Sequence, residues 1–235
     1  MNISSALKLS FTYNTDFAEA EVDQRRVNLT RFPLRYAEKR SFFLEGAGVY
    51  SFSPRNDVTP FFSRRIGISG GKQIPINAGA KLSGQIGNYE IGFIQTQTRS
   101  IDNIKGENFS VARVKRPFLK QSYLGLVLTD RSARDGDIDS LSLDQTLYGA
   151  DLELKTSEFL GDKNLQFQSF FVFHSAPMFN NDLSISDLST RGLRITYPND
   201  IIRTHVSYRE FGDMYSPSLG FSRRNGFKWS HFRIS

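Results

Sequence analysis

Four carboxylates near the N-terminus have the side chains for one kind of chemistry, because pairs of Asp and Glu residues hydrolyse glycosidic bonds. They are Glu21, Asp23, Glu38 and Glu45. In such enzymes one carboxyl group protonates the leaving group, and the other activates water or attacks the sugar. The sequence gives neither a pocket nor a distance between these groups, and charged linings of β-barrels contain such pairs routinely. We therefore predict that the chain is not an enzyme, and keep a glycoside hydrolase as the weakest alternative.

Acidic and histidine residues elsewhere in the sequence do not form a metal-binding pattern. The stretch from Asp135 to Asp139 begins like a calcium loop, but Ser140 and Thr146 stand where an EF-hand has glycine and glutamate. None of the three histidines has the spacing of metal ligands; they are His174, His205 and His231. Phosphate-binding loops, dinucleotide fingerprints and serine-nucleophile motifs are missing from the sequence too. We expect no metal and no cofactor.

The alternation of short turns with long polar connections predicts how the chain is built. Between residues 78 and 209, polar and apolar side chains alternate along successive strand-like runs. Short turns are predicted at Gly87-Asn88, around 117–119, at Gly161-Asp162 and at Pro198-Asn199-Asp200. Polar stretches too long for tight turns occupy residues 99–107, 131–144 and 175–189. Transmembrane β-barrels have this asymmetry, because their periplasmic turns are short and their outer loops are long.

We therefore predict an all-β fold, namely an antiparallel up-and-down transmembrane β-barrel, present in part, with about ten strands. The first strand is expected near Ala6 to Tyr13, and the last is expected to begin near Leu219. Residues 1–235 are taken as a single barrel domain, or a fragment of one. Within it, residues 14–67 form a charged plug or loop segment, and residues 78–235 form successive hairpins.

Alternation also predicts which side chains face lipid, since successive residues of a strand point to opposite faces. The predicted lipid-facing rows are Leu124, Leu126, Leu128; Tyr148, Ala150, Leu152, Leu154; Leu193, Ile195, Tyr197; and Ile202, Thr204, Val206, Tyr208. The predicted polar interior comprises Gly149, Asp151, Glu153, Arg194, Thr196, Arg203, His205 and Ser207. An arginine at Leu126 is expected to cost about 2 to 4 kcal/mol at mid-bilayer, and the same change at Ser207 is expected to be mild.

Composition narrows the class of protein further. The chain has 39% hydrophobic residues and no cysteine, its mean hydropathy is −0.38, and it has no apolar run near the ~20 residues of a membrane helix. Its net charge is +6, but Lys81, Arg113, Lys115 and other basic residues are dispersed over several predicted strands. Because no nucleic-acid-binding motif accompanies them, we exclude nucleic acid as a partner. The first residues lack the features of a secretory signal, so we expect this chain to be a fragment or to have a misassigned start.

Residues 14–67 are dense in charge and lack clean alternation. If extended, Glu19, Glu21 and Asp23 share one face, so they need cationic partners nearby. We hypothesise that this segment is an inward-facing plug at the barrel mouth, held by Arg–carboxylate pairs. A periplasmic loop with a solvated charged face is the alternative. The candidate charge network comprises Glu19, Glu21, Asp23, Glu38, Arg40, Glu45, Arg64 and Arg65.

Several blocks of this segment carry a resemblance to a known family. They are residues 14–24, 27–32, 37–48 and 61–67, followed downstream by 79–84, 109–114 and 211–223. Together these blocks resemble the signature of an uncharacterised outer-membrane β-barrel family of Gram-negative bacteria, a domain of unknown function. Thr15, Ala37 and Ser41 stand where that family has proline. The resemblance covers the first part of the barrel, which in that family follows a periplasmic carbohydrate-binding-like domain of the family 9 type.

The resemblance and the residue pattern together suggest a membrane function. We expect an outer-membrane channel or scaffold, located in the bacterial outer membrane, with lipid as its partner. Association with carbohydrate binding or uptake is implied only by the resemblance, through a domain that this chain lacks. The competing interpretation is a soluble β-sandwich that binds carbohydrate, in which the apolar rows would pack against each other.

Overall fold

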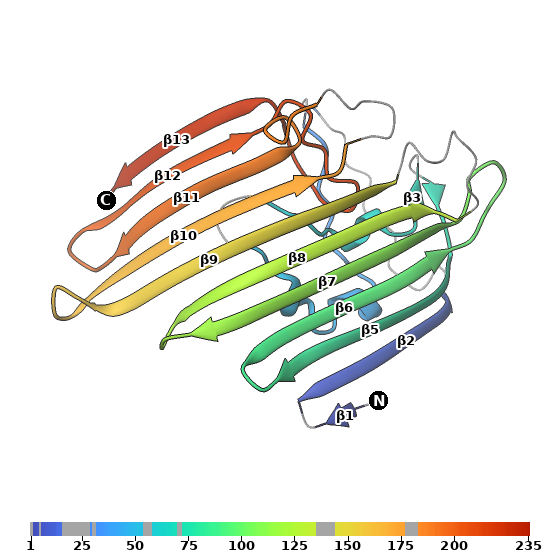
Figure 1. Cartoon of the computed structure of the whole chain (residues 1–235), viewed down its shortest axis with the longest axis horizontal. Helices are drawn as coiled ribbons and strands as arrows, with labels where there is room; N and C mark the ends of the chain where they lie inside the picture. Colours follow the sequence, from blue (N-terminus) through green and yellow to red (C-terminus); the bar gives the residue numbers. More distant parts are fainter. Residues whose placement is uncertain are drawn as a thin grey trace.

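The computed structural model describes residues 2–4, 6–15, 29, 32–53, 58–69, 72–134, 144–176 and 183–235. Over these residues the fold is all-β, and most of them form one antiparallel sheet of eleven strands (Figure 1). The strands of this sheet are β1 (Asn2–Ser4), β2 (Leu7–Thr15), β5 (Ile76–Ile86), β6 (Tyr89–Thr98), β7 (Glu107–Phe118), β8 (Ser122–Ala133), β9 (Gln145–Phe159), β10 (Lys163–His174), β11 (Ser189–Pro198), β12 (Arg203–Phe211) and β13 (Phe227–Ile234). Two short strands, β3 (Ile68–Ser69) and β4 (Lys72–Gln73), pair separately.

From β5 onwards each strand pairs with the next one in sequence, so the sheet is a meander. Tight turns join β5 to β6, β7 to β8, β9 to β10 and β11 to β12, all at one end of the sheet (Figure 1). Gly87, with φ of 53°, lies in the predicted two-residue turn between Ile86 and Tyr89. Longer connections follow β6, β8, β10 and β12 at the opposite end. The predicted alternation of short and long connections is confirmed.

The sheet is not closed into a barrel among the described strands. Its order runs from β1 at one edge to β13 at the other, and these two strands are not paired with each other (Figure 1). The prediction of about ten antiparallel strands in an all-β fold is confirmed. These strands form an open meander and do not close into a barrel. The last strand begins at Phe227 rather than near Leu219, because Leu219 lies buried in the core instead.

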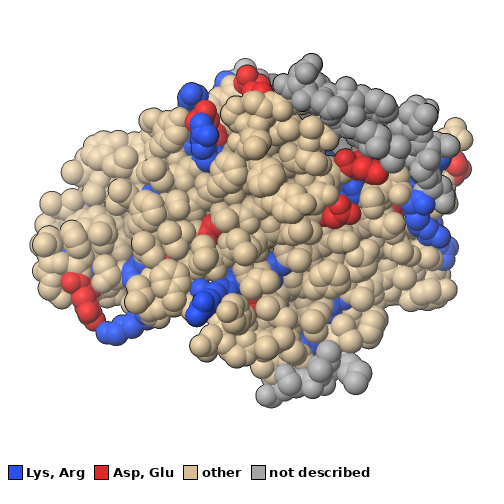
Figure 2. Space-filling model, in the orientation of Figure 1, with Lys and Arg blue, Asp and Glu red and all other residues tan. Residues whose placement is uncertain are grey.

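The two faces of the sheet differ in what covers them. We call the face that packs against the rest of the chain the inner face, and the opposite one the outer face. Leu124, Leu126 and Leu128 on β8 are exposed on the outer face, as are Leu193 and Ile195 on β11. Figure 2, which looks onto this face, shows a broad surface with few charged side chains in its centre. The side chains of these rows therefore point away from the interior, as predicted.

The predicted start of the last lipid-facing row is wrong, at the turn between β11 and β12. Residues 201 and 202 were expected to begin a strand, but β12 begins at Arg203. Ile201 and Ile202 therefore lie in the turn, where both are exposed. The error is one of boundary, since Thr204, Val206 and Tyr208 still alternate with inward-facing Ser207 and Arg209.

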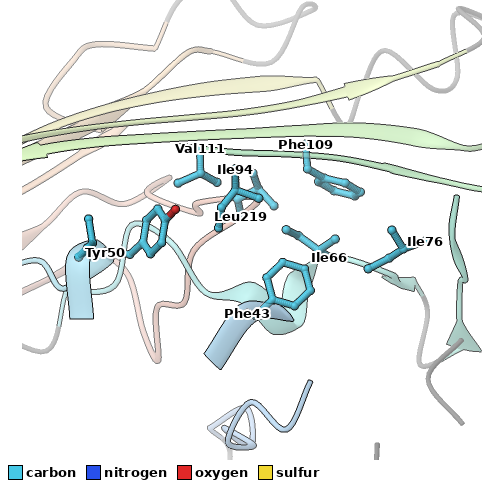
Figure 3. Packing of buried hydrophobic residues seen from close by; sticks show 9 residues of the cluster. Phe43, Tyr50, Ile66, Ile76, Ile94, Phe109, Val111 and Leu219 are labelled. Atoms are coloured by element: carbon cyan, nitrogen blue, oxygen red, sulfur yellow. The ribbon is translucent and has the colours of Figure 1, made fainter. Parts of the chain in front are cut away.

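The inner face is covered by a layer of irregular chain and short helices, which we call the inner layer (residues 32–53, 58–66 and 212–221). It includes α1 (Ser41–Leu44), η2 (Ala47–Tyr50) and η3 (Ser63–Arg65). Phe43, Tyr50, Ile66 and Leu219 of this layer form a core with strand residues (Figure 3). The strand residues of that core are Ile76, Ile94, Phe109 and Val111.

A second apolar cluster lies under the other half of the sheet. Phe52, Val58 and Tyr215 of the inner layer pack there against Phe170 and Val172 of β10. Burial of these side chains supplies the apolar stabilisation of the fold, at about 1.5 to 3 kcal/mol for each large side chain. No helix of the described residues is long and apolar enough to span a membrane.

Candidate functional site

The inward-facing residues change character along the strands. On β7, Phe109 and Val111 lie toward the long-loop end, whereas Arg113 and Lys115 lie toward the tight-turn end. The same change occurs on β10, from Val172 to the buried amide of Gln168. The inner face of the sheet is therefore apolar toward the long-loop end of the strands, and polar and charged toward the tight-turn end. We call the latter part the polar half. Charged groups taken out of water need partners, so the polar half is the candidate site.

An ion pair between β7 and β9 lies at the centre of this site. Arg113 Nη1 is 2.7 Å from Asp151 Oδ1, and both side chains have 0% exposure. A second contact, from Arg113 Nη2 to Asp151 Oδ2, measures 3.0 Å. The Tyr123 hydroxyl donates to the same carboxylate oxygen at 3.0 Å. The forked geometry suits a guanidinium facing a carboxylate, so this pair is held in one orientation.

The ion pair also binds the inner layer to the sheet. Asp151 Oδ2 accepts from the backbone N–H of Ser53 at 2.8 Å, and Arg113 donates to the carbonyl of Ser51 at 2.9 Å. The Arg113 guanidinium also lies 5.1 Å from the centre of the Phe52 ring. Three consecutive residues of the inner layer are thus fixed by one pair of strand residues.

Two lysines hold neighbouring parts of the inner layer by its backbone oxygens. Lys81 donates to the carbonyl of Glu45 at 2.6 Å and also to that of Phe42. Lys115 donates to the Ser51 hydroxyl at 3.0 Å and lies 3.5 Å from a carboxylate oxygen of Glu90. Lys115 also donates to the carbonyl of Gly48 in η2 at 3.3 Å. Strand cations therefore face backbone carbonyls in or next to the short helices α1 and η2.

Glu38 and Arg40, two members of the predicted network, form a pair within the inner layer. Arg40 Nη2 is 2.7 Å from Glu38 Oε2, and Arg40 Nε is 2.9 Å from Oε1. Arg40 also donates to the carbonyls of Ile66 and Ser63, at 2.9 and 2.8 Å. The Ser63 hydroxyl donates to Glu38 at 2.6 Å. The pair therefore links the residue before α1 to η3, and so connects two segments of the inner layer.

The pKa of Glu38 reflects these contacts. Burial by itself raises the pKa of this carboxyl, but the hydrogen bonds and charge of Arg40, with the Ser63 hydroxyl, outweigh burial and lower it from 4.5 to about 2. Glu38 is therefore ionised at neutral pH, with both oxygens engaged. A general acid for glycoside hydrolysis needs a raised pKa instead, so this geometry does not favour that role.

The other described residues of the predicted network make different contacts. Glu45 forms an ion pair with Lys8 of β2, Arg64 donates to the carbonyl of Ala37 at 3.2 Å, and Arg65 donates to the carbonyl of Gly220 at 3.0 Å. The remaining three, Glu19, Glu21 and Asp23, lie outside the described residues, as do Asp135 to Asp139. Residues 14 and 15 belong to β2 rather than to a plug.

Sequence reasoning missed the central ion pair and misjudged the basic residues. Lys81, Arg113 and Lys115 were considered dispersed over the strands, yet Arg113 and Lys115 share β7 and all three face the inner layer. A signal existed in the alternation itself, since Arg113 and Lys115 share a strand face with Phe109 and Val111. A charged residue in such a row is expected to meet a partner from elsewhere in the chain.

Two of the histidines, which are far apart in sequence, lie together in the fold, and His205 lies on the inner face as predicted. His205 Nε2 and His231 Nδ1 are 2.8 Å apart, although the residues are distant in sequence. His174 lies elsewhere and accepts from the backbone N–H of Ser216 at 3.1 Å. Among the described residues no group of three or more His, Cys, Asp or Glu side chains is placed to hold a metal ion.

Comparison with known proteins gives one partial match. Residues 2–91 match the model of a family described as a domain of unknown function, DUF5916. The match covers β1 to β5, the start of β6 and the larger part of the inner layer, which is less than half of the chain. No curated protein and no solved structure matches the chain. The resemblance noted in the sequence is thus supported for a domain of unknown function over its N-terminal blocks, and the blocks at 109–114 and 211–223 lie beyond the match.

Proposed function

We propose that this chain forms part of the wall of an outer-membrane β-barrel, which serves as a channel or scaffold. In this proposal lipid covers the outer face, and the inner layer lies within the lumen as a plug. Further β-structure pairing with the edges at β1 and β13 would close the wall. The tight turns would lie on the periplasmic side and the long connections outside.

The observation that supports the proposal is the kind of side chain found on each face of the sheet. Large apolar side chains are exposed along the outer face, with Leu126 at 57%, whereas the charged pair Arg113–Asp151 is fully buried beneath the inner layer. A water-soluble sheet protein normally places these two classes the other way round. Contiguous exposed apolar surface of this kind marks contact with a membrane or another protein, and an apolar band on a β-sheet fits lipid.

The competing soluble β-sandwich requires the apolar rows to pack against a second sheet. The rows on β8, β9 and β11 are exposed instead, which favours the membrane proposal. Association with carbohydrate rests on the resemblance to a family whose barrel follows a carbohydrate-binding-like domain. It is proposed here on that ground alone, as a role in glycan capture or uptake.

Arginine substitutions at two exposed leucines test the membrane proposal. Leu126 lies in the middle of β8, and Leu160, 79% exposed, lies in the tight turn after β9. With lipid on the outer face, Leu126→Arg lowers the free energy of unfolding in bilayers by about 2 to 4 kcal/mol, and Leu160→Arg, near the interface, by about 0 to 1 kcal/mol. Equal small effects at both positions would contradict the proposal.

Leu160 replaces Ser207 as the control position. Ser207 was expected to accept arginine easily as a lumen-facing residue, but it is only 4% exposed. An arginine there would have to displace packed neighbours, and overpacking typically costs about 1 to 3 kcal/mol. An arginine at Ser207 is therefore expected to destabilise the fold rather than to have a mild effect.

A further inference from the structure

The inner face of β12 and β13 carries a second group of charged residues, separate from the Arg113–Asp151 site. At the long-loop end, a cavity of about 460 Å³ is lined by Arg209 and Trp229 from these strands and by Arg223 and Arg224 from the connection between them. Arg35 of the inner layer and Lys228 of β13 complete its basic lining. The aromatic rings of Phe32, Phe221 and Phe227 form much of the remaining wall.

A second cavity, of about 340 Å³, lies at the tight-turn end of the same strands. Its basic lining comes from Arg194, Arg203, His205 and Arg233. No aspartate or glutamate of the described residues lines either cavity. The nearby Glu210 lines neither cavity; it pairs with Arg191 at 3.0 Å and with Lys228, a lining residue of the first cavity, at 3.4 Å.

The strand register places lining residues of the two cavities in one row. Arg209 pairs with Trp229, Ser207 with His231, and His205 with Arg233. Directly opposed residues of antiparallel strands share a face, so these side chains form a row along the inner face. From Arg209 to Arg203 the row extends ~20 Å at the usual rise of a strand. It reaches from the loop end of the sheet to the turn end.

The chemistry of this row suits an acidic oligosaccharide. Guanidinium groups bind carboxylates through paired hydrogen bonds, and a positive surface without acidic residues attracts anions. Trp229 is 43% exposed, and the Arg209 guanidinium lies 4.0 Å from the centre of its ring system. Aromatic rings offer an apolar face on which the C–H face of a sugar can pack. Carboxylates spaced along a chain of sugars would meet successive cations of the row.

We propose that the inner face of β11 to β13 binds oligosaccharides that carry uronate carboxylates. The saccharide class rests on the proposed function, because it specifies the glycan that such a channel or scaffold would take. The basic row itself does not depend on the membrane. In a barrel it would line the lumen from one side of the membrane to the other.

Trp229 allows a direct test, because it is the chain's one tryptophan. The full chain is titrated with tetragalacturonate in whichever buffer or detergent keeps it monodisperse, and its tryptophan fluorescence is followed. We expect a saturable change whose midpoint rises with salt, because charge pairing is screened. Maltotetraose, a neutral oligosaccharide of equal length, is expected to give no saturable change.

Substitutions locate the binding. The double variant Arg223→Gln, Arg224→Gln removes two exposed cations of the first cavity and is expected to weaken tetragalacturonate binding at least tenfold. Lys120→Gln, at the exposed turn after β7, removes a cation elsewhere and is expected to leave binding unchanged. No saturable response, an equal response to maltotetraose, or equal affinities of the double variant and the wild type would overturn the inference. The Leu126→Arg measurement is independent of this titration, so failure of the membrane proposal and failure of the binding proposal are distinguishable.

Discussion

At the scale of single residues, Arg113 and Asp151 show the demands of burying charge. Removing two charges from water is costly, and their attraction repays this only if the remaining hydrogen-bonding groups find partners. Here Tyr123 and the backbone of Ser51 and Ser53 supply partners, whereas the buried Arg113 Nε has no hydrogen-bond partner among the described residues. The pair therefore acts as a geometric constraint that joins two strands and the inner layer.

Asp151→Asn tests this constraint, because it removes one charge and leaves Arg113 buried. We expect the free energy of unfolding to fall by about 3 to 5 kcal/mol, as for other buried pairs that lose one partner. Glu158→Gln is the matched control, since its pair with Lys120 is exposed and such pairs contribute about 0 to 1 kcal/mol. Denaturant unfolding of both variants gives the comparison. Similar losses in the two would contradict the role given to Asp151.

Glu38 makes the stability of the protein depend on pH. Its pKa is about 2 in the folded protein and 4.5 ordinarily, so the unfolded chain binds the proton more readily. The stabilisation is fully present above pH 4.5 and is lost as the pH falls toward 2; by linkage it amounts to about 3 kcal/mol. Unfolding measured at several pH values for wild type and Glu38→Gln is expected to show a difference that shrinks over this window. A difference that does not change with pH would contradict the assignment.

At the scale of elements, the inner layer is held by polar contacts at its backbone and by apolar contacts at its side chains. Gly92 of β6 shows how closely it approaches the sheet, since a Cβ there would lie 2.7 Å from Val49 and 2.8 Å from Tyr50. Gly46, with φ of 65°, allows the chain to turn between α1 and η2. The layer is thus fitted to the strands rather than loosely attached.

Phe43→Ala tests whether the inner layer is a packed plug. Phe43 is buried in the core, whereas Leu44, its neighbour in α1, is 50% exposed. We expect Phe43→Ala to cost about 3 to 5 kcal/mol and to open the layer locally. Trypsin should then cleave after Arg64 and Arg65 on the order of a hundredfold faster, while Leu44→Ala should cleave at the wild-type rate. Rapid cleavage at these arginines in the folded wild type would contradict the plug.

At the scale of the whole molecule, the exposed apolar face has consequences for behaviour in solution. Rows of large apolar side chains on the outer face, with Phe11 and Phe232 on strands near the two edges, exceed what a soluble monomer normally exposes. We expect the purified chain to stay monodisperse in detergent and to associate when detergent is removed, as measured by light scattering. A monodisperse, detergent-free monomer would contradict the membrane proposal.

The open edges at β1 and β13 have a related consequence. An edge strand presents N–H and C=O groups that can pair with another strand. The sheet order leaves β13 paired on one side only. Closure with further β-structure would satisfy these groups, and it is part of the proposed function for that reason.

The sequence by itself determined the strand faces, most of the turns and the side on which long connections lie. These features depend on neighbouring residues only, because side chains alternate along a strand and Gly87-Asn88 favours a tight turn locally. The apolar rows on β8, β9 and β11 could therefore be assigned without coordinates. The family blocks at 14–67 predicted a separate segment for the same reason, since their pattern is not that of a strand.

Only the tertiary structure decided which charged groups meet. Arg113 and Asp151 are 38 positions apart, and Asp151 and Ser53 are 98 apart. Such contacts depend on the register of several strands and on the path of the inner layer, which local alternation does not specify. The same holds for His205 and His231, and for the basic row on β12 and β13. Pairing across strands brought these side chains together, because antiparallel register places residues distant in sequence on one face.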